Sequence, residues 1–219
     1  MDYRQIILVI VGGILGYTSL TLAKELMKRR GEVPSGKLLN GTLSIIIWVI
    51  VGMLIGLGIG LLKTGWFRTT ELVLLCFILL SLSMVDAKIR KIPNQLLIAL
   101  VVLRLTALTY GTITGDTVGN DWLNSAIGAV AGWIIFTVPG MFGLMVGWGD
   151  VKFAAVSGLY LGVIGMVQAM LVMSLIILVY GLTLVIAKKG SFKTAVAYGP
   201  ALSVGIVVTT LMPLVERLI

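Results

Sequence analysis

Two aspartates at the ends of hydrophobic stretches are the residues of this sequence best suited to chemistry. Asp86 follows the apolar run of residues 72–85, and Asp150 closes another such run. A carboxylate at the end of a membrane span is costly and by default functional. If folding brings the two together, they share a proton, so that one can deprotonate water while the other polarises a peptide carbonyl. The pair therefore predicts aspartic protease chemistry.

Asp86 is followed by a short basic segment, residues 87–91, and then by Ile92, Pro93 and Asn94. Proline suits the first turn of a helix because its missing N–H would be unpaired there in any case. We therefore expect a short, stiff connection that holds Asp86 close to the next helix, with Pro93 and Asn94 supporting the site. The alternative is a solvated carboxylate that balances the neighbouring basic side chains.

Asp150 lies in a second motif, in which Gly147 and Gly149 flank Trp148 and Lys152 follows. The glycines make the backbone permissive, so a substrate strand or another helix can approach closely. Lys152 supplies a cation that can anchor a carboxylate or a lipid headgroup. The alternative is an interfacial turn in which the tryptophan anchors the membrane surface and Asp150 caps the following helix.

The composition indicates which elements must position these residues. The 219 residues are 58% hydrophobic and only 12% charged, about half the charged share of a soluble domain. This predicts an all-α, polytopic integral membrane protein that forms one membrane-embedded domain over residues 1–219. The net charge of +8 lies mostly between hydrophobic runs, so the expected partner is the lipid bilayer and not nucleic acid. Histidine is absent and Cys76 is the only cysteine, so no metal or cofactor is predicted.

Hydrophobic stretches long enough to cross a bilayer predict about eight helices, at residues 5–23, 42–62, 70–86, 94–113, 123–145, 151–166, 168–187 and 195–214. The sixth and seventh are the weakest, so the count lies between six and eight, with a tight hairpin near residues 162–168 as one interpretation. Lysine and arginine number twelve in the connections assigned to the inside and four outside. This bias places the amino terminus outside and both aspartates at the cytoplasmic face.

The run from Asp86 to Asn94, the Gly-Trp-Gly-Asp-Val-Lys run at residues 147–152 and the Tyr-Gly-Pro at residues 198–200 resemble the type IV prepilin peptidase family. The resemblance covers roughly residues 70–205 and is to the small, peptidase-only branch. Members are polytopic aspartic proteases of the inner (plasma) membrane. The resemblance implies removal of the short basic leader from prepilins or pseudopilins at the cytoplasmic side, with Asp86 and Asp150 as the catalytic dyad.

Many members of that family carry a larger first cytoplasmic loop with paired cysteines and also methylate the new amino terminus. Here the loop spans only Lys24 to Gly41 and contains no cysteine, which argues against N-methyltransferase activity. Glu32 in this loop reads as surface charge. The alternative function is a small cation- or proton-coupled transporter using the same aspartates, although transporters place such groups near the bilayer midplane. The filament system and the oligomeric state stay open.

Overall fold

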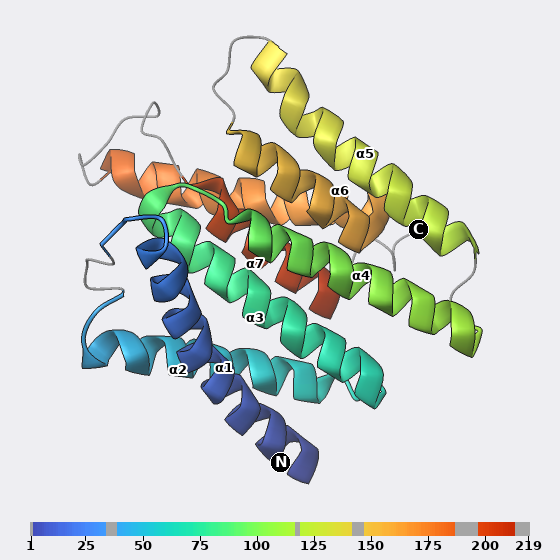
Figure 1. Cartoon of the computed structure of the whole chain (residues 1–219), viewed down its shortest axis with the longest axis horizontal. Helices are drawn as coiled ribbons and strands as arrows, with labels where there is room; N and C mark the ends of the chain where they lie inside the picture. The colour runs from blue at the N-terminus through green and yellow to red at the C-terminus, as the bar shows by residue number, and fades with distance from the viewer. Residues whose placement is uncertain (1, 34–38, 117–118, 142–146, 187–196, 213–219) are drawn as a thin grey trace. The chain divides into compact units, whose positions relative to one another are not determined.

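The computed structural model describes residues 2–33, 39–116, 119–141, 147–186 and 197–212. Over these ranges the chain forms helices and no strands (Figure 1). Six helices are long and apolar enough to cross a membrane, and the last is a shorter apolar helix. The predicted all-α, multi-pass membrane fold is therefore confirmed, while the outside position of the amino terminus stays a prediction. The helices are α1 (Tyr3–Lys28), α2 (Thr42–Leu61), α3 (Trp66–Ile89), α4 (Asn94–Thr114), α5 (Gly119–Met141), α6 (Trp148–Ile186) and α7 (Tyr198–Leu211).

The chain divides into two compact units, Met1–Ala107 and Leu108–Ile219. Unit 1 contains α1, α2, α3 and the larger part of α4, and unit 2 contains the end of α4 with α5, α6 and α7. The single domain expected over residues 1–219 stays a prediction. The ends of three predicted spans, at residues 142–145, 187, 195–196 and 213–214, lie outside the described residues.

Helix α6 spans 39 residues and is broken at Gly162. Gly162 has φ 72° and ψ −174°, a conformation that glycine adopts without steric cost. The Val163 N–H donates to Oδ1 of Asn124 in α5 at 3.1 Å, and the chain turns back at this break (Figure 1). The break lies in the predicted hairpin segment. The predicted boundary between spans six and seven, at residue 167, is wrong, because the glycine and its asparagine partner set the turn five residues earlier.

Helices α1 and α2 of unit 1 pack through glycines that bring their backbones into contact. A Cβ at Gly12 would overlap the carbonyl of Gly52, and a Cβ at Gly52 would overlap the carbonyl of Gly12. Gly56 lies in the same way against the carbonyl of Leu8. Small residues form such interfaces because helices in lipid associate through close backbone packing. The α1–α2 pair is therefore a rigid support for α3.

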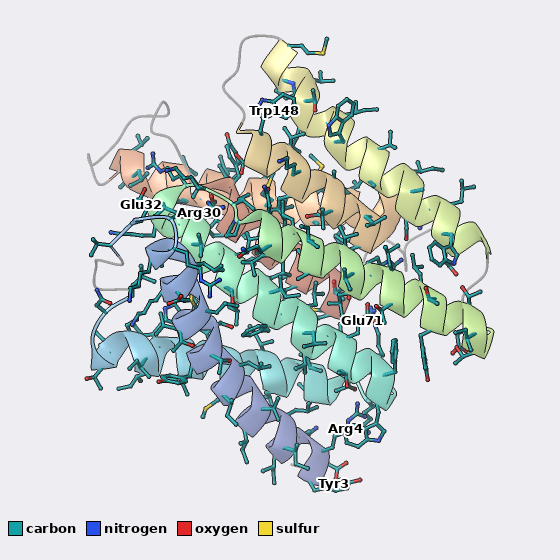
Figure 2. The ribbon with its side chains drawn as sticks, in the orientation of Figure 1. Tyr3, Arg4, Arg30, Glu32, Glu71 and Trp148 are labelled. Atoms are coloured by element: carbon teal, nitrogen blue, oxygen red, sulfur yellow. The ribbon has the colours of Figure 1, made fainter. Side chains whose placement is uncertain are left out.

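Arg4 ties the start of α1 to the connection between α2 and α3 (Figure 2). Its Nη2 donates to the carbonyl of Thr64 at 2.5 Å and to Oγ1 of Thr69 at 2.6 Å. Its guanidinium carbon lies 5.7 Å from the centroid of the Trp66 ring, within the range of a cation–π contact. Asp86, at the other end of α3, is thus carried by an anchored helix.

In unit 2, α5 and the first arm of α6 pack through a second set of small residues. Gly128 faces Gly158, and Gly132 faces Ala154, so closely that a Cβ on either α5 glycine would overlap a carbonyl of α6. The partners are four residues apart on each helix and run in opposite directions. The contact ends one helical turn from Asp150, so it holds the segment from which the carboxylate projects.

Candidate active site

Asp86 lies in the last turn of α3 and is only 3% exposed. The helix ends at Ile89, and Arg90 adopts the left-handed conformation with φ 51° and ψ 38°. The Arg90 N–H donates to the carbonyl of Asp86 at 2.9 Å, which closes the final turn. Because the residue is buried, the alternative of a solvated surface carboxylate does not describe Asp86.

The connection after Asp86 is as short as its sequence predicts. Only residues 90–93 separate α3 from α4. The Pro93 carbonyl accepts the N–H groups of Leu96 at 3.1 Å and Leu97 at 3.4 Å, so Pro93 begins the hydrogen bonding of α4. Pro93 is buried and Asn94, the first residue of α4, is exposed. The proline thus supports the loop, and the Asn94 side chain faces the surroundings of unit 1.

Asp150 is the third residue of α6 and is half-buried. The Gly147 carbonyl accepts the N–H groups of Asp150 at 2.9 Å and Val151 at 3.2 Å, which makes Gly147 the N-cap. A Cβ built on Gly147 would lie 2.9 Å from Oδ2 of Asp150, so the carboxylate lies directly over the cap. Sequence reasoning expected this glycine to admit a substrate; in the structure it makes room for the carboxylate.

The neighbours of Asp150 are open to their surroundings. Gly149 is half-exposed and the Lys152 side chain is exposed. Trp148 is 71% exposed at the very start of α6 (Figure 2). An indole in this position suits a membrane–water interface, where its ring and N–H meet different environments. The motif thus combines a half-buried carboxylate with exposed neighbours at the start of α6.

The two aspartates occupy opposite kinds of helix end. Asp150 lies in the first turn of α6, where unpaired backbone N–H groups and the helix dipole stabilise negative charge. Asp86 lies in the last turn of α3, where the dipole has the opposite sign, and it is buried. The two carboxylates therefore lie at helix ends of opposite polarity.

The predicted site residues fall into two groups by unit. Asp86, Pro93 and Asn94 gather at the α3–α4 connection of unit 1, and Gly147, Gly149, Asp150 and Lys152 gather at the start of α6 in unit 2. The meeting of the two carboxylates in one dyad stays a prediction. Within the described ranges, no three acidic or cysteine side chains cluster as metal ligands would.

Sequence reasoning missed two residues that contact the Asp86 loop. Arg30 donates to the carbonyls of Lys91 and Ile92, and Glu32 forms an ion pair with Lys91. Glu32 was expected to be plain surface charge. No local pattern could have revealed these contacts, because about sixty residues of chain separate the partners.

The fold and the two acidic motifs define a multi-pass helical membrane protein with a candidate pair of carboxylates. Residues 73–182 match the type IV leader peptidase family, and this range holds both Asp86 and Asp150. The chain therefore belongs to the type IV leader peptidase family. It is similar to the prepilin leader peptidase/N-methyltransferase of Neisseria gonorrhoeae, with 33% identity over 168 residues, which are 73% of this chain and 54% of that protein. The chain thus spans about half the length of this relative. No solved structure matches it significantly.

Proposed function

We propose that the chain is a membrane aspartic endopeptidase that removes the short basic leader from type IV prepilins or prepilin-like proteins. The observation that carries this proposal is the family match, because residues 73–182 contain both aspartates and both of their motifs. Asp86 is buried in the last turn of α3, and Asp150 lies in the first turn of α6 next to the N-cap Gly147. Each therefore has a defined position, as reacting groups require.

In the proposed reaction, one of Asp86 and Asp150 is the base and the other is the acid. The ionised aspartate takes a proton from water, and the hydroxide attacks the scissile carbonyl, whose oxygen is polarised by the proton on the other aspartate. Collapse of the tetrahedral intermediate breaks the C–N bond as the leaving amine receives the proton that the aspartate took from water.

The remaining motif residues have supporting roles in this proposal. Pro93 and Gly147 shape the two backbones that carry the carboxylates. Asn94 and Gly149 lie where a substrate strand can hydrogen-bond or pass closely, and Lys152 can hold a carboxylate or lipid headgroup at the surface. No cofactor or metal is required by this chemistry, because the two carboxylates supply both proton transfers.

We also propose a plasma-membrane location with the site facing the cytoplasm. The support is the excess of basic residues in the connections on the side of the two aspartates, which orients membrane proteins towards the cytoplasm. Cysteine scanning with a membrane-impermeant thiol reagent tests it. Labelling of Asn94→Cys in right-side-out vesicles, without lysis, would contradict this orientation.

We propose further that the chain cleaves without methylating its product. The support is that the segment from Lys24 to Gly41 carries no cysteine, although the gonococcal relative is named for both activities. Mass spectrometry of the cleaved pilin in cells expressing this chain tests the proposal. A mature product that carries an added methyl group only when the chain is present would overturn it.

The experiment that tests the main proposal compares cleavage of a panel of prepilin leaders by the wild type and by Asp86→Asn and Asp150→Asn variants in detergent or liposomes. Each substitution keeps size but removes the acid–base function, so we expect a loss of at least about 100-fold. Asp116→Asn is the matched control, because Asp116 is exposed and lies after α4. Near-normal cleavage by either variant would refute the dyad. No cleavage by folded wild type would favour transport, tested by ion flux.

A further inference from the structure

The loop after Asp86 is held by side chains from the segment that follows α1. Arg30 donates from Nη1 to the carbonyl of Lys91 at 3.3 Å and from Nη2 to the carbonyl of Ile92 at 3.4 Å. Nζ of Lys91 lies 3.5 Å from Oε1 of Glu32. Figure 2 shows Arg30 and Glu32 beside this loop. Three polar contacts therefore join two connections that are far apart in the sequence.

The contacts of Arg30 supply hydrogen-bond donors to two carbonyls that lie between the helices. Residues 90–93 lie between α3 and α4, so the carbonyls of Lys91 and Ile92 are outside regular helical hydrogen bonding and need other donors. A guanidinium presents its N–H groups as a planar fork, whereas an ammonium is a compact point charge. Arg30 uses this fork, with one Nη on each of two consecutive carbonyls.

The same loop is coupled to Asp86 through the backbone. Arg90 adopts a left-handed conformation, which is unfavourable for a residue with a side chain. Its N–H nevertheless closes the last turn of α3 on the carbonyl of Asp86. A strained residue of this kind persists only when its surroundings hold it, and the residue that follows it is Lys91, whose carbonyl Arg30 binds.

We propose that Arg30 is a positioning residue for the Asp86 carboxylate, and that Glu32 assists it by holding Lys91. The inference rests on the proposed function, because it takes Asp86 as a catalytic group. Without Arg30, the two loop carbonyls lose their donors, the strained turn at Arg90 relaxes, and the last turn of α3 shifts. Displacement of a catalytic group by about 1 Å costs about 100-fold in rate. Because the clamp is largely exposed, we expect a smaller loss of about tenfold.

The test compares Arg30→Gln, Arg30→Lys and the matched control Arg29→Gln in the full chain in detergent micelles. Arg29 carries the same charge at the neighbouring position, but its ion pair is with Glu25 of α1 at 3.1 Å. Two quantities are measured: kcat and KM for a prepilin leader peptide, and hydrogen–deuterium exchange of the segment 86–97. The exchange measurement reports on the loop independently of activity and of overall unfolding.

We expect Arg30→Gln to lower kcat about tenfold with KM nearly unchanged and to speed exchange in the segment 86–97. Arg30→Lys keeps the charge without the fork, so it should fall between Arg30→Gln and the wild type. Arg29→Gln should match the wild type in both measurements. Three results would overturn the positioning role. They are an effect of Arg30→Gln on KM alone, equal losses of kcat in Arg29→Gln and Arg30→Gln, and unchanged hydrogen exchange of the segment 86–97 in Arg30→Gln. If the wild type cleaves no prepilin while Arg30→Gln still speeds exchange, the proposed function has failed and the catalytic part of this inference fails with it.

Discussion

Replacing Gly147 with alanine probes how tightly the start of α6 holds the Asp150 carboxylate. The added Cβ would lie 2.9 Å from Oδ2 and 3.7 Å from Cγ of Asp150. Ordinary contact begins at 3.4 Å, so the carboxylate oxygen must move by about 0.5 Å. Gly147 is not among the glycines with positive φ, so alanine can adopt its backbone conformation. The atom that must move is therefore Oδ2 of the proposed catalytic residue Asp150.

The size of the effect follows from this displacement. Misplacing a reacting group by 1 Å costs about 100-fold, so half that distance should lower kcat about tenfold, which corresponds to about 1.4 kcal/mol of transition-state stabilisation. Stability should fall by only about 1 kcal/mol, because alanine is a poorer N-cap than glycine. We expect Gly147→Ala to fold like the wild type and to cleave prepilin slowly.

Gly158→Ala is the matched control, since it adds the same methyl group to the same helix. Its Cβ would overlap the carbonyl of Gly128 and lie 3.2 Å from the backbone nitrogen of Ala129. Backbone cannot move aside as a side-chain tip can, so this variant should lose about 1–3 kcal/mol of stability while its folded fraction keeps its kcat. The assay is cleavage per folded molecule, with thermal unfolding in detergent run in parallel. Wild-type kcat for Gly147→Ala, or destabilisation equal to that of Gly158→Ala, would refute the reasoning.

Two further predictions concern the helix contacts that support the site. Gly52→Leu should lower the thermal stability, because the new side chain would force α2 away from the Gly12 carbonyl. Gly181→Ala should not, because its Cβ meets open space. Equal melting temperatures would contradict the close α1–α2 contact. Asn124→Ala should lower the stability by about 1 kcal/mol and speed hydrogen exchange at the Val163 N–H, because it removes the acceptor of that group. Asn124→Asp keeps an acceptor oxygen, so it should keep the Val163 N–H protected from exchange. Unchanged exchange at Val163 in Asn124→Ala would show that the asparagine does not hold the turn.

The helical fold was largely predictable because its signals are local. Runs of apolar residues and their lengths decide which segments can span a membrane, and six of the observed helices meet that criterion. The ends of α3 and α4 around Pro93 were predictable for the same reason. The break in α6 was predicted only to within residues 162–168, because the sequence alone does not select one position in this segment. Asn124, on another helix, selects Gly162.

The candidate site was predictable in its residues but not in how they are held. Asp86 lies in the last turn of α3, as its motif predicted. Asp150 was expected to close the fifth span, but it is the third residue of α6. The role of Gly147 depends on the rotamer of Asp150, which no sequence pattern specifies. The contacts of Arg30 and Glu32 with the Asp86 loop depend on how α1 packs beside α3, so they became visible only with the fold.

The glycine contacts between helices determine which part of the structure moves when a loop residue is substituted. Gly12 and Gly52 in unit 1, and Gly128 and Gly158 in unit 2, already bring opposing backbones into contact. Helices packed this closely cannot shift to accommodate a new atom in a neighbouring connection. A substitution at a loop residue such as Arg30 or at the cap of α6 must therefore be accommodated locally, by the turn that carries the carboxylate. For this reason we expect loop variants to change the rate per folded molecule, and variants of the helix contacts to change how much folded protein there is.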